Sequence, residues 1–242
     1  MSIFDFVHNP NKTNDHRIYG VTVGVVTNNK DPEKLGRVKI KLPTRLGEKE
    51  TDWARIVTPM AGKKMGMFFL PEVGDEVLVT FREGDMREPY VIGSLWNNEE
   101  IPPENNEDGK NNIRKIKSRA GHEITITDDD SEGSIEIKTK NGNAIRILDK
   151  GNGKVEINDK SGANKITIDG DKKAVSVEGD GKIQLKSKTC TINVDGNGSA
   201  VEVKSNTKVA IESTTVEIKA KANLNISSDG MVNIKGSMVK IN

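Results

Sequence analysis

The C-terminal half of the chain repeats one short pattern: a branched apolar residue, a middle residue that is usually polar, a second branched apolar residue and a turn. The pattern occurs fourteen times from residue 124 onward, and its spacing falls from 11 residues to 7. Strict alternation places both apolar side chains of a unit on one face of a short strand. The apolar pairs are Ile124/Ile126, Ile135/Ile137, Ile145/Ile147, Val155/Ile157, Ile166/Ile168, Val175/Val177, Ile183/Leu185, Ile192/Val194, Val201/Val203, Val209/Ile211, Val216/Ile218, Leu224/Ile226, Val232/Ile234 and Val239/Ile241.

The segments between the pairs and the residue types that are missing both indicate stacked strands. Gly, Asn and Asp recur between the pairs, as in residues 141–143 and 195–198, and these types tolerate positive φ. No aromatic residue follows Trp96 and no proline follows Pro103. A thin core and a continuous backbone ladder are expected from such a composition.

A strand with only two inward side chains cannot bury them by itself, so the repeat predicts a multi-chain object. We expect three chains to wind about one axis as an intertwined triple-stranded β-helix needle over residues 122–242, with strands from all three chains on each face. Each buried side chain contributes about 1.5–3 kcal/mol, so folding and trimerisation are expected to be one event. The predicted trimer core includes Ile124, Ile126, Ile135, Ile137, Ile145, Ile147, Ile157, Ile166, Ile168, Ile183, Ile192, Ile211, Ile218 and Ile226.

The N-terminal part has a different character, because it holds all nine aromatic residues and all eight prolines within its first 103 positions. Short alternating runs punctuated by Gly and Pro predict a small β-barrel over residues 18–96. A polar, proline-containing connector follows at 97–121, and an arm of residues 1–17 precedes the barrel. The predicted fold class is therefore all-β. The runs read as barrel strands are residues 18–26, 36–43, 53–57, 66–70, 76–81 and 90–93.

Several motifs in the barrel resemble those of one known family. They are Asp31-Pro32 with Gly36-Arg37-Val38, then Trp53-Ala54-Arg55, residues 71–77, Gly84-Asp85, Pro89 and residues 93–96. This ordered set resembles the OB-fold domain of contractile-tail spike proteins, the phage baseplate assembly protein V group and the VgrG spikes of type VI secretion. Members of this family carry a trimeric β-helix directly after the barrel, which the repeat requires independently.

The resemblance implies a homotrimeric central spike at the tip of a contractile machine, driven through the target envelope with transient membrane contact. The barrel end would sit on a tail hub. The hub is expected to be a separate protein, because only about 17 residues precede the barrel. Ile3, Phe4 and Phe6 are candidates for docking to the hub or a neighbouring protomer, and a disordered tail is the alternative. No secretory signal is recognisable, so synthesis in the bacterial cytoplasm and assembly into a particle are expected.

The needle end is the other candidate docking site. The sequence stops inside the repeat, and exposed strand edges usually need a cover. The resemblance implies a small PAAR-type tip protein on that face. The residues predicted to dock it are Val232, Ile234, Val239, Ile241 and Asn242.

Neither charge nor motifs point to chemistry in this chain. The 37 basic and 36 acidic residues balance, which argues against nucleic-acid binding. No Gly-x-Ser-x-Gly, His-Glu-x-x-His or Gly-x-x-x-x-Gly-Lys motif is present. We therefore expect no enzyme activity, catalytic residue, cofactor or metal site. A nucleic-acid-binding OB module with an oligomerising stalk and a tailspike depolymerase are the alternatives considered.

A few single residues have both a functional and a structural interpretation. Residues 128–130, three aspartates, could bind a cation but are typical of a solvated turn. His122 beside Glu123 is expected to be a junction pair, and Cys190 an inward or corner residue. Four aromatic side chains could stack bases on an OB surface, but core positions are expected for them: Trp53, Phe68, Phe69 and Phe81.

Overall fold

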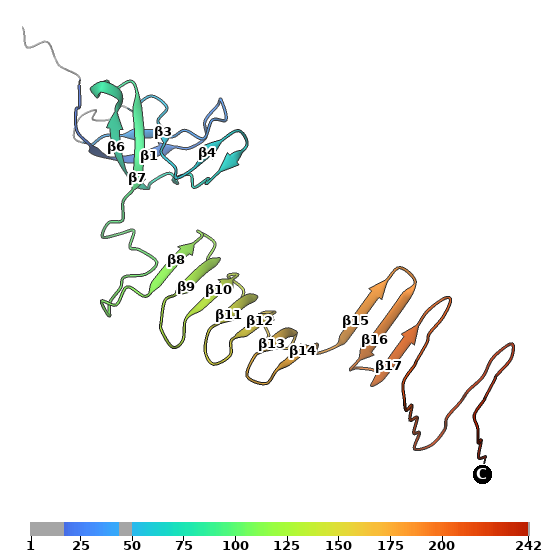
Figure 1. The fold of residues 1–242 in the computed structure, drawn as a ribbon. Helices are drawn as coiled ribbons and strands as arrows, with labels where there is room; N and C mark the ends of the chain where they lie inside the picture. Colours follow the sequence, from blue (N-terminus) through green and yellow to red (C-terminus); the bar gives the residue numbers. More distant parts are fainter. Residues whose placement is uncertain (1–16, 44–49, 242) are drawn as a thin grey trace, which may run out of the picture. The chain divides into compact units, whose positions relative to one another are not determined.

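A computed structural model describes residues 17–43 and 50–241 of the chain (Figure 1). Its regular elements are strands, apart from one short 3₁₀ turn, η2 (Arg82–Gly84), so the predicted all-β class is confirmed for the described part. The chain divides into two units, Met1–Ile116 and Lys117–Asn242.

The first unit is built on a five-stranded sheet in the order β2-β1-β6-β7-β3. Neighbouring strands pair antiparallel, except for the short parallel pair of β3 and β7. A separate two-stranded hairpin consists of β4 and β5. The strands are β1 (Thr22–Asn28), β2 (Lys39–Lys41), β3 (Arg55–Ile56), β4 (Ala61–Gly62), β5 (Met65–Gly66), β6 (Glu76–Phe81) and β7 (Pro89–Ser94).

Alternation along the strands sorts the side chains of this unit between core and surface. Every second residue of β6 is buried, and these residues join side chains from the other strands in one apolar cluster. Phe81 belongs to the cluster, as predicted. The buried members are Ile18, Val26, Val38, Ile40, Leu42, Ala54, Val77, Val79, Phe81 and Val91.

The core positions predicted for Phe68 and Phe69 are wrong. Their side chains are 75% and 65% exposed. The strand expected at 66–70 ends at Gly66, whose φ of 142° is a conformation that L side chains rarely adopt, and the chain leaves the hairpin there. Trp53 is half-buried, with the cationic groups of Arg37 and Lys39 at 6.0 and 5.7 Å from its ring centroid.

These positions predict different responses to truncation. Ile40→Ala should lower the free energy of unfolding of this unit by about 2–5 kcal/mol, because it removes fully buried atoms. Phe69→Ala should change it by less than about 0.5 kcal/mol, because the ring is mostly in solvent. Denaturant titration of the full chain, followed by tryptophan fluorescence, measures both, since both tryptophans lie before residue 97. Equal losses for the two variants would contradict this assignment of the core.

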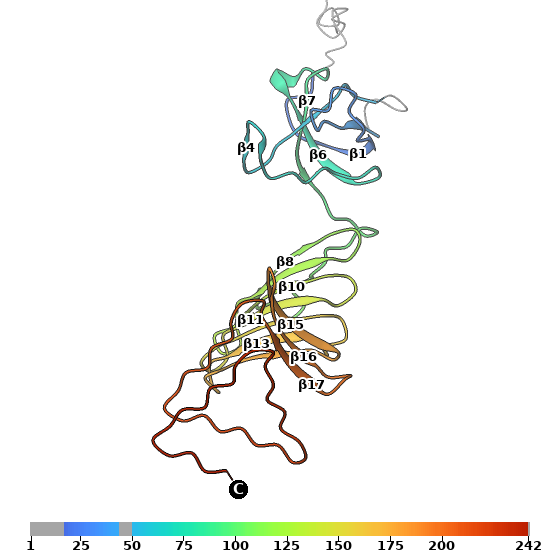
Figure 2. The same cartoon turned by 90° about the vertical axis from the view of Figure 1, so that its right-hand side faces the viewer.

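Two sheets follow the first unit: a seven-stranded sheet in the order β14-β13-β12-β11-β10-β9-β8, antiparallel from β9 to β14, and a three-stranded sheet, β15-β16-β17 (Figures 1 and 2). All of their strands belong to the second unit except β8, of which only Lys117 does. The strands β9–β17 carry the first nine of the predicted apolar pairs. The bounds are β8 (Ile113–Lys117), β9 (Glu123–Thr127), β10 (Ser134–Lys138), β11 (Ala144–Leu148), β12 (Lys154–Asn158), β13 (Lys165–Asp169), β14 (Ala174–Glu178), β15 (Lys182–Ser187), β16 (Cys190–Asp195) and β17 (Ala200–Lys204).

One strand was not predicted. β8 lies in the range 97–121 that the sequence suggests as a connector. Its two isoleucines, Ile113 and Ile116, are three positions apart, so β8 lacks the two-residue period of the other strands. Its place in the sheet comes from its neighbour β9.

Strand pairing differs from the expected arrangement, in which each face alternates strands from three chains. Between residues 113 and 204, consecutive strands of one chain pair antiparallel within two sheets. Short connections reverse the chain between them: after β10, the Gly142 N–H donates to Thr139 O at 2.9 Å, with Gly142 at φ 96°. The predicted corners are therefore hairpin turns in this part of the chain.

The last five predicted pairs form no strand in this structure. No strand is assigned anywhere from residue 205 to residue 241, all of which are described. Three residues of the predicted trimer core, Ile211, Ile218 and Ile226, lie in this segment and are exposed.

Candidate assembly surface

Two apolar ladders run across one face of the seven-stranded sheet. The register pairs Ile135 with Ile126 on one side and with Ile147 on the other, and it pairs Ile137 with Ile124 and Ile145 in the same way. The pattern continues through the next three strands. The ladders are Ile126–Ile135–Ile147–Val155–Ile168–Val175 and Ile124–Ile137–Ile145–Ile157–Ile166–Val177.

The three-stranded sheet repeats this arrangement. Its ladders are Ile183–Val194–Val201 and Leu185–Ile192–Val203. Cys190, predicted to be an inward or corner residue, is the first residue of β16 and is exposed, with its Sγ 3.4 Å from Ser205 Oγ. We call the apolar faces of the two sheets together the assembly surface.

None of the residues that the structure describes covers this surface. The nine isoleucines of β9–β13 are 39–50% exposed, whereas Ile40 in the barrel core is fully buried. Isoleucine side chains remain half-exposed when nothing packs on the face of the sheet that carries them. Contiguous apolar patches of this length are rare on monomers and mark interaction surfaces. The assembly surface is therefore the candidate interaction surface of this unit.

The opposite face of the sheet is polar and internally bonded. Arg146 lies directly between Glu136 and Glu156 in the register. Its Nε donates to Glu136 Oε1 at 2.6 Å and its Nη1 donates to Asn158 Oδ1 at 2.7 Å. In the second sheet the Gln184 amide donates to Asn193 Oδ1 at 2.7 Å. Two polar side chains of these faces are nevertheless buried: Thr167 is 8% and Asn193 is 9% exposed, and Thr167 Oγ1 makes no hydrogen bond.

The predicted site residues are therefore not all brought together. The core residues from Ile124 to Ile192 stand on the assembly surface, and Ile211, Ile218 and Ile226 do not. Val232, Ile234, Val239 and Ile241 are exposed and belong to no strand. Asn242, Ile3, Phe4 and Phe6 lie outside the described residues.

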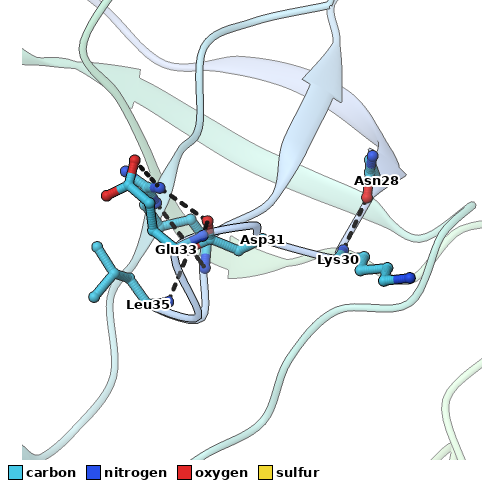
Figure 3. Close-up of polar contacts among 6 residues, drawn as sticks. Asn28, Lys30, Asp31, Glu33 and Leu35 are labelled. Atoms are coloured by element: carbon cyan, nitrogen blue, oxygen red, sulfur yellow. Dashed lines mark hydrogen bonds and ion pairs between the residues drawn. The ribbon is translucent and has the colours of Figure 1, made fainter.

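A carboxylate organises the loop between β1 and β2 (Figure 3). Asp31 accepts hydrogen bonds from the backbone N–H groups of Glu33 and Leu35, both at 3.0 Å, and from Arg37 Nε and Nη2 at 2.9 and 2.8 Å. Its side chain is only 3% exposed. The Arg37 guanidinium and these N–H groups hold the pKa of Asp31 well below its usual range. Asp31 and Arg37 belong to the motif that resembles the spike family. Their hydrogen bonds fix the conformation of the loop between β1 and β2.

The residues considered for cation binding or acid–base chemistry make contacts that stabilise turns and strand pairs. Asp129 Oδ1 accepts hydrogen bonds from the N–H groups of Ser131 and Glu132, which is turn geometry. His122 Nδ1 accepts from the Lys140 N–H, and Glu123 pairs with Lys117 at 3.0 Å. Within residues 17–43 and 50–241, no group of three or more His, Cys, Asp or Glu is placed to hold a metal ion. The same residues include no helix of the length and hydropathy that a membrane crossing needs.

Comparison with known proteins identifies the OB part of the chain. Residues 22–96 match the family described as the type VI secretion system/phage-baseplate injector OB domain. The predicted resemblance to the VgrG-like spike family is thereby confirmed.

Curated relatives match over stretches of 68 to 95 residues. The chain is 36% identical over 95 residues to the type VI secretion system spike protein VgrG5 of Pseudomonas aeruginosa, and 33% identical over 75 residues to VgrG1a of the same organism. It is 34% identical over 68 residues to the spike protein VgrG3 of Vibrio cholerae. These matches cover 36%, 29% and 26% of this chain but only 12%, 12% and 7% of the relatives. The likeness therefore concerns a small part of those proteins.

Proposed function

We propose that this chain forms the homotrimeric central spike of a contractile injection machine. The observation that carries the proposal is the assembly surface, whose apolar side chains stay half-exposed in a single chain, together with the match of the barrel to an injector OB domain. The arm (1–17), barrel (18–96), connector (97–121) and needle (122–242) are its parts, with β8 extending the needle sheet into the connector.

The width of the assembly surface favours three copies. Each strand contributes two apolar side chains, so each ladder pair is about 7 Å wide. Three such narrow faces can meet at one axis and leave no channel. Two faces would instead pack as a sandwich about 10 Å thick. A rigid shaft of three sheets suits a part that is pushed through an envelope when a sheath contracts, with transient membrane contact.

The first test is the mass and shape of the purified full chain. Sedimentation should give three times the chain mass, and electron microscopy should show a knob with one rod. The trimer should also resist dodecyl sulfate without boiling, because its chains separate only when the whole shaft becomes exposed. A folded monomer, or a dimer, with ordered sheets would contradict the proposal.

The two ends of the spike are proposed to have separate partners. The barrel end would sit on a tail hub protein, with Ile3, Phe4 and Phe6 as contacts. The needle end would bind a small PAAR-type tip protein through Val232, Ile234, Val239, Ile241 and Asn242. The exposure of the four described residues in this second set supports that role.

Deletions of similar size separate these partners. Removing residues 236–242 should abolish capture of a co-expressed PAAR-type tip protein and leave the trimer intact, because it removes part of the docking set. Removing residues 2–10 should leave tip capture unchanged and weaken attachment to the hub. Equal tip capture by all three proteins, measured by affinity pull-down, would refute the assigned tip site.

In this proposal the chain is synthesised in the bacterial cytoplasm and built into the particle, and it catalyses no reaction. Neither alternative function is favoured by the site. A nucleic-acid module would use aromatic side chains near a basic groove, and a depolymerase would pair carboxylates with aromatic sugar platforms. The apolar ladders serve neither purpose.

A further inference from the structure

The β4–β5 hairpin of the barrel unit (Figure 1) borders an open apolar groove. The groove has a volume of about 670 Å³, within the range of about 300–1,000 Å³ that is usual for ligand pockets. Three stretches of chain line it, residues 34–36, 56–62 and 64–70. Phe68 in its wall is 75% exposed, and Leu35 and Met65 are each 65% exposed. Apolar side chains gathered in this way mark an interaction surface.

Hydrogen bonds within the barrel unit fix the walls of the groove. The Leu35 N–H donates to Asp31 Oδ2 at 3.0 Å, which holds the first stretch in place. Thr58 Oγ1 donates to Met67 O at 2.7 Å, and the Met67 N–H donates to Met60 O at 3.1 Å, which joins the other two stretches. A groove that is already ordered has little conformational entropy to lose when a ligand binds.

Charge narrows the kind of ligand that fits the groove. Lys34 and Lys64 line it, Lys63 precedes Lys64 in the hairpin turn, and none of the three lining stretches contains an acidic residue. Glu33, next to the first stretch, is paired with Arg37 at 3.0 Å. A ligand with apolar side chains and a negative charge is therefore complementary. A second copy of the groove is not, because it would bring lysines against lysines.

The N-terminal arm has this chemistry. Residues 3–7 are Ile-Phe-Asp-Phe-Val, four apolar side chains with Asp5 as the single charge. The described chain starts at Arg17, which forms a β-bridge with Asp85 of the barrel. The ten residues from Val7 to Arg17 extend to about 33–36 Å at most, whereas a compact domain of about 80 residues is about 30 Å across. The arm is therefore long enough to reach the groove of its own barrel.

We propose that residues 3–7 dock in the groove of their own barrel. In an extended segment Phe4 and Phe6 point to one side and Asp5 to the other. The rings would contact the methionines of the groove, whose flexible side chains adapt to the shape of a ligand. The carboxylate would lie at the rim, next to the two exposed lysines.

The tether favours this occupant over a separate protein. A short flexible linker gives the tethered segment an effective concentration in the millimolar range. The groove would then shelter the apolar arm until the spike meets its hub, to which Ile3, Phe4 and Phe6 are assigned above. Only this exchange of partners rests on the proposed function. Docking of the arm in the free protein does not depend on it.

Zero-length cross-linking tests where the arm lies. A carbodiimide joins a carboxylate directly to a lysine in contact with it, so the full chain should give a product of Asp5 with Lys34 or Lys64. Lys39 and Glu50, 3.4 Å apart in the same barrel, are the internal positive control. If only the control pair is joined, the inference is wrong.

Isotope mixing shows which copy supplies the arm. Light- and heavy-nitrogen-labelled full chains are refolded together in equal amounts before the carbodiimide is added. Docking within one chain predicts Asp5 products that carry a single label. Mixed-label products would overturn the assignment of the arm to its own barrel.

Methionine oxidation supplies a second readout. Peroxide converts an accessible thioether into a sulfoxide, so a docked arm should slow the oxidation of Met65 and Met67. The double variant Phe4→Ala with Phe6→Ala should raise both rates several-fold, as measured by mass spectrometry. Met86 packs against the barrel core, away from the groove lining, and should keep its rate.

The matched control is Asn9→Ala with Asn11→Ala, which changes polar side chains of the same arm and should leave every rate unaltered. Equal rates in the unmodified chain and both variants would show that the arm does not cover the groove. Sedimentation of the same samples reports their mass. A docked arm on a monomer would refute the trimeric spike but not this inference, and an undocked arm on a trimer would do the reverse.

Discussion

Replacing Ile137 with lysine is expected to convert the assembly into monomers. Ile137 lies in the middle of a ladder, between Ile124 and Ile145. Each substitution forfeits about 1.5–3 kcal/mol of apolar burial, and enclosing an unpartnered ammonium group costs several kcal/mol more. Three copies of the change at one level of the axis add up to more than about 10 kcal/mol per trimer by the same estimates.

The matched control is Thr125→Lys. Thr125 lies on the neighbouring strand β9, and its side chain is on the polar face, directly opposite Glu136. A lysine there stays in water next to a carboxylate, so this variant should remain trimeric. Sedimentation velocity reports the mass, and tryptophan fluorescence reports whether the barrel is still folded. Trimers from Ile137→Lys would show that the ladders do not form the interface.

Replacing Asp31 with alanine is expected to give the largest loss of stability in the barrel from a single polar side chain. The change leaves two backbone N–H groups and the Arg37 guanidinium without their acceptor. Losing several charge-assisted hydrogen bonds in a domain of this size should lower its melting temperature by about 5–15 °C. Glu33→Gln is the control: Glu33 also pairs with Arg37, but its side chain is 66% exposed, so the effect should be small.

The same carboxylate predicts a pH dependence. The pKa of Asp31 is lowered in the folded state, chiefly by its hydrogen bonds with Arg37. Its stabilisation is therefore fully present above the unfolded carboxyl pKa of about 3.9 and is lost as the pH falls through the folded pKa. Thermal melts of the barrel between neutral pH and pH 2 should show a smaller decline in Asp31→Asn than in the unmodified chain. Parallel declines would mean that other carboxylates govern acid unfolding.

Part of this structure follows from sequence alone, because a strand alternates with a period of two. Alternation placed Ile135 and Ile137 on one face and Glu136 on the other, whatever the neighbouring strands are. It likewise assigned Phe81 to the barrel core. The motif residues Asp31 and Arg37 were recognised in the sequence as part of one turn. The hydrogen bonds between them became known only from the structure.

The identity of each strand's neighbour was decided by the tertiary structure. A two-residue period says which face a side chain occupies, but not whether the next strand comes from the same chain. That choice depends on whether the connections can reverse the chain, as the one at Gly142 does. Similarly, β8 was recognised only from its place beside β9, and Phe68 and Phe69 are exposed because the chain leaves the hairpin at Gly66. The alternation of apolar and polar residues determined which side chains share an apolar face. The pairing of strands distant in sequence determined which of these side chains are buried.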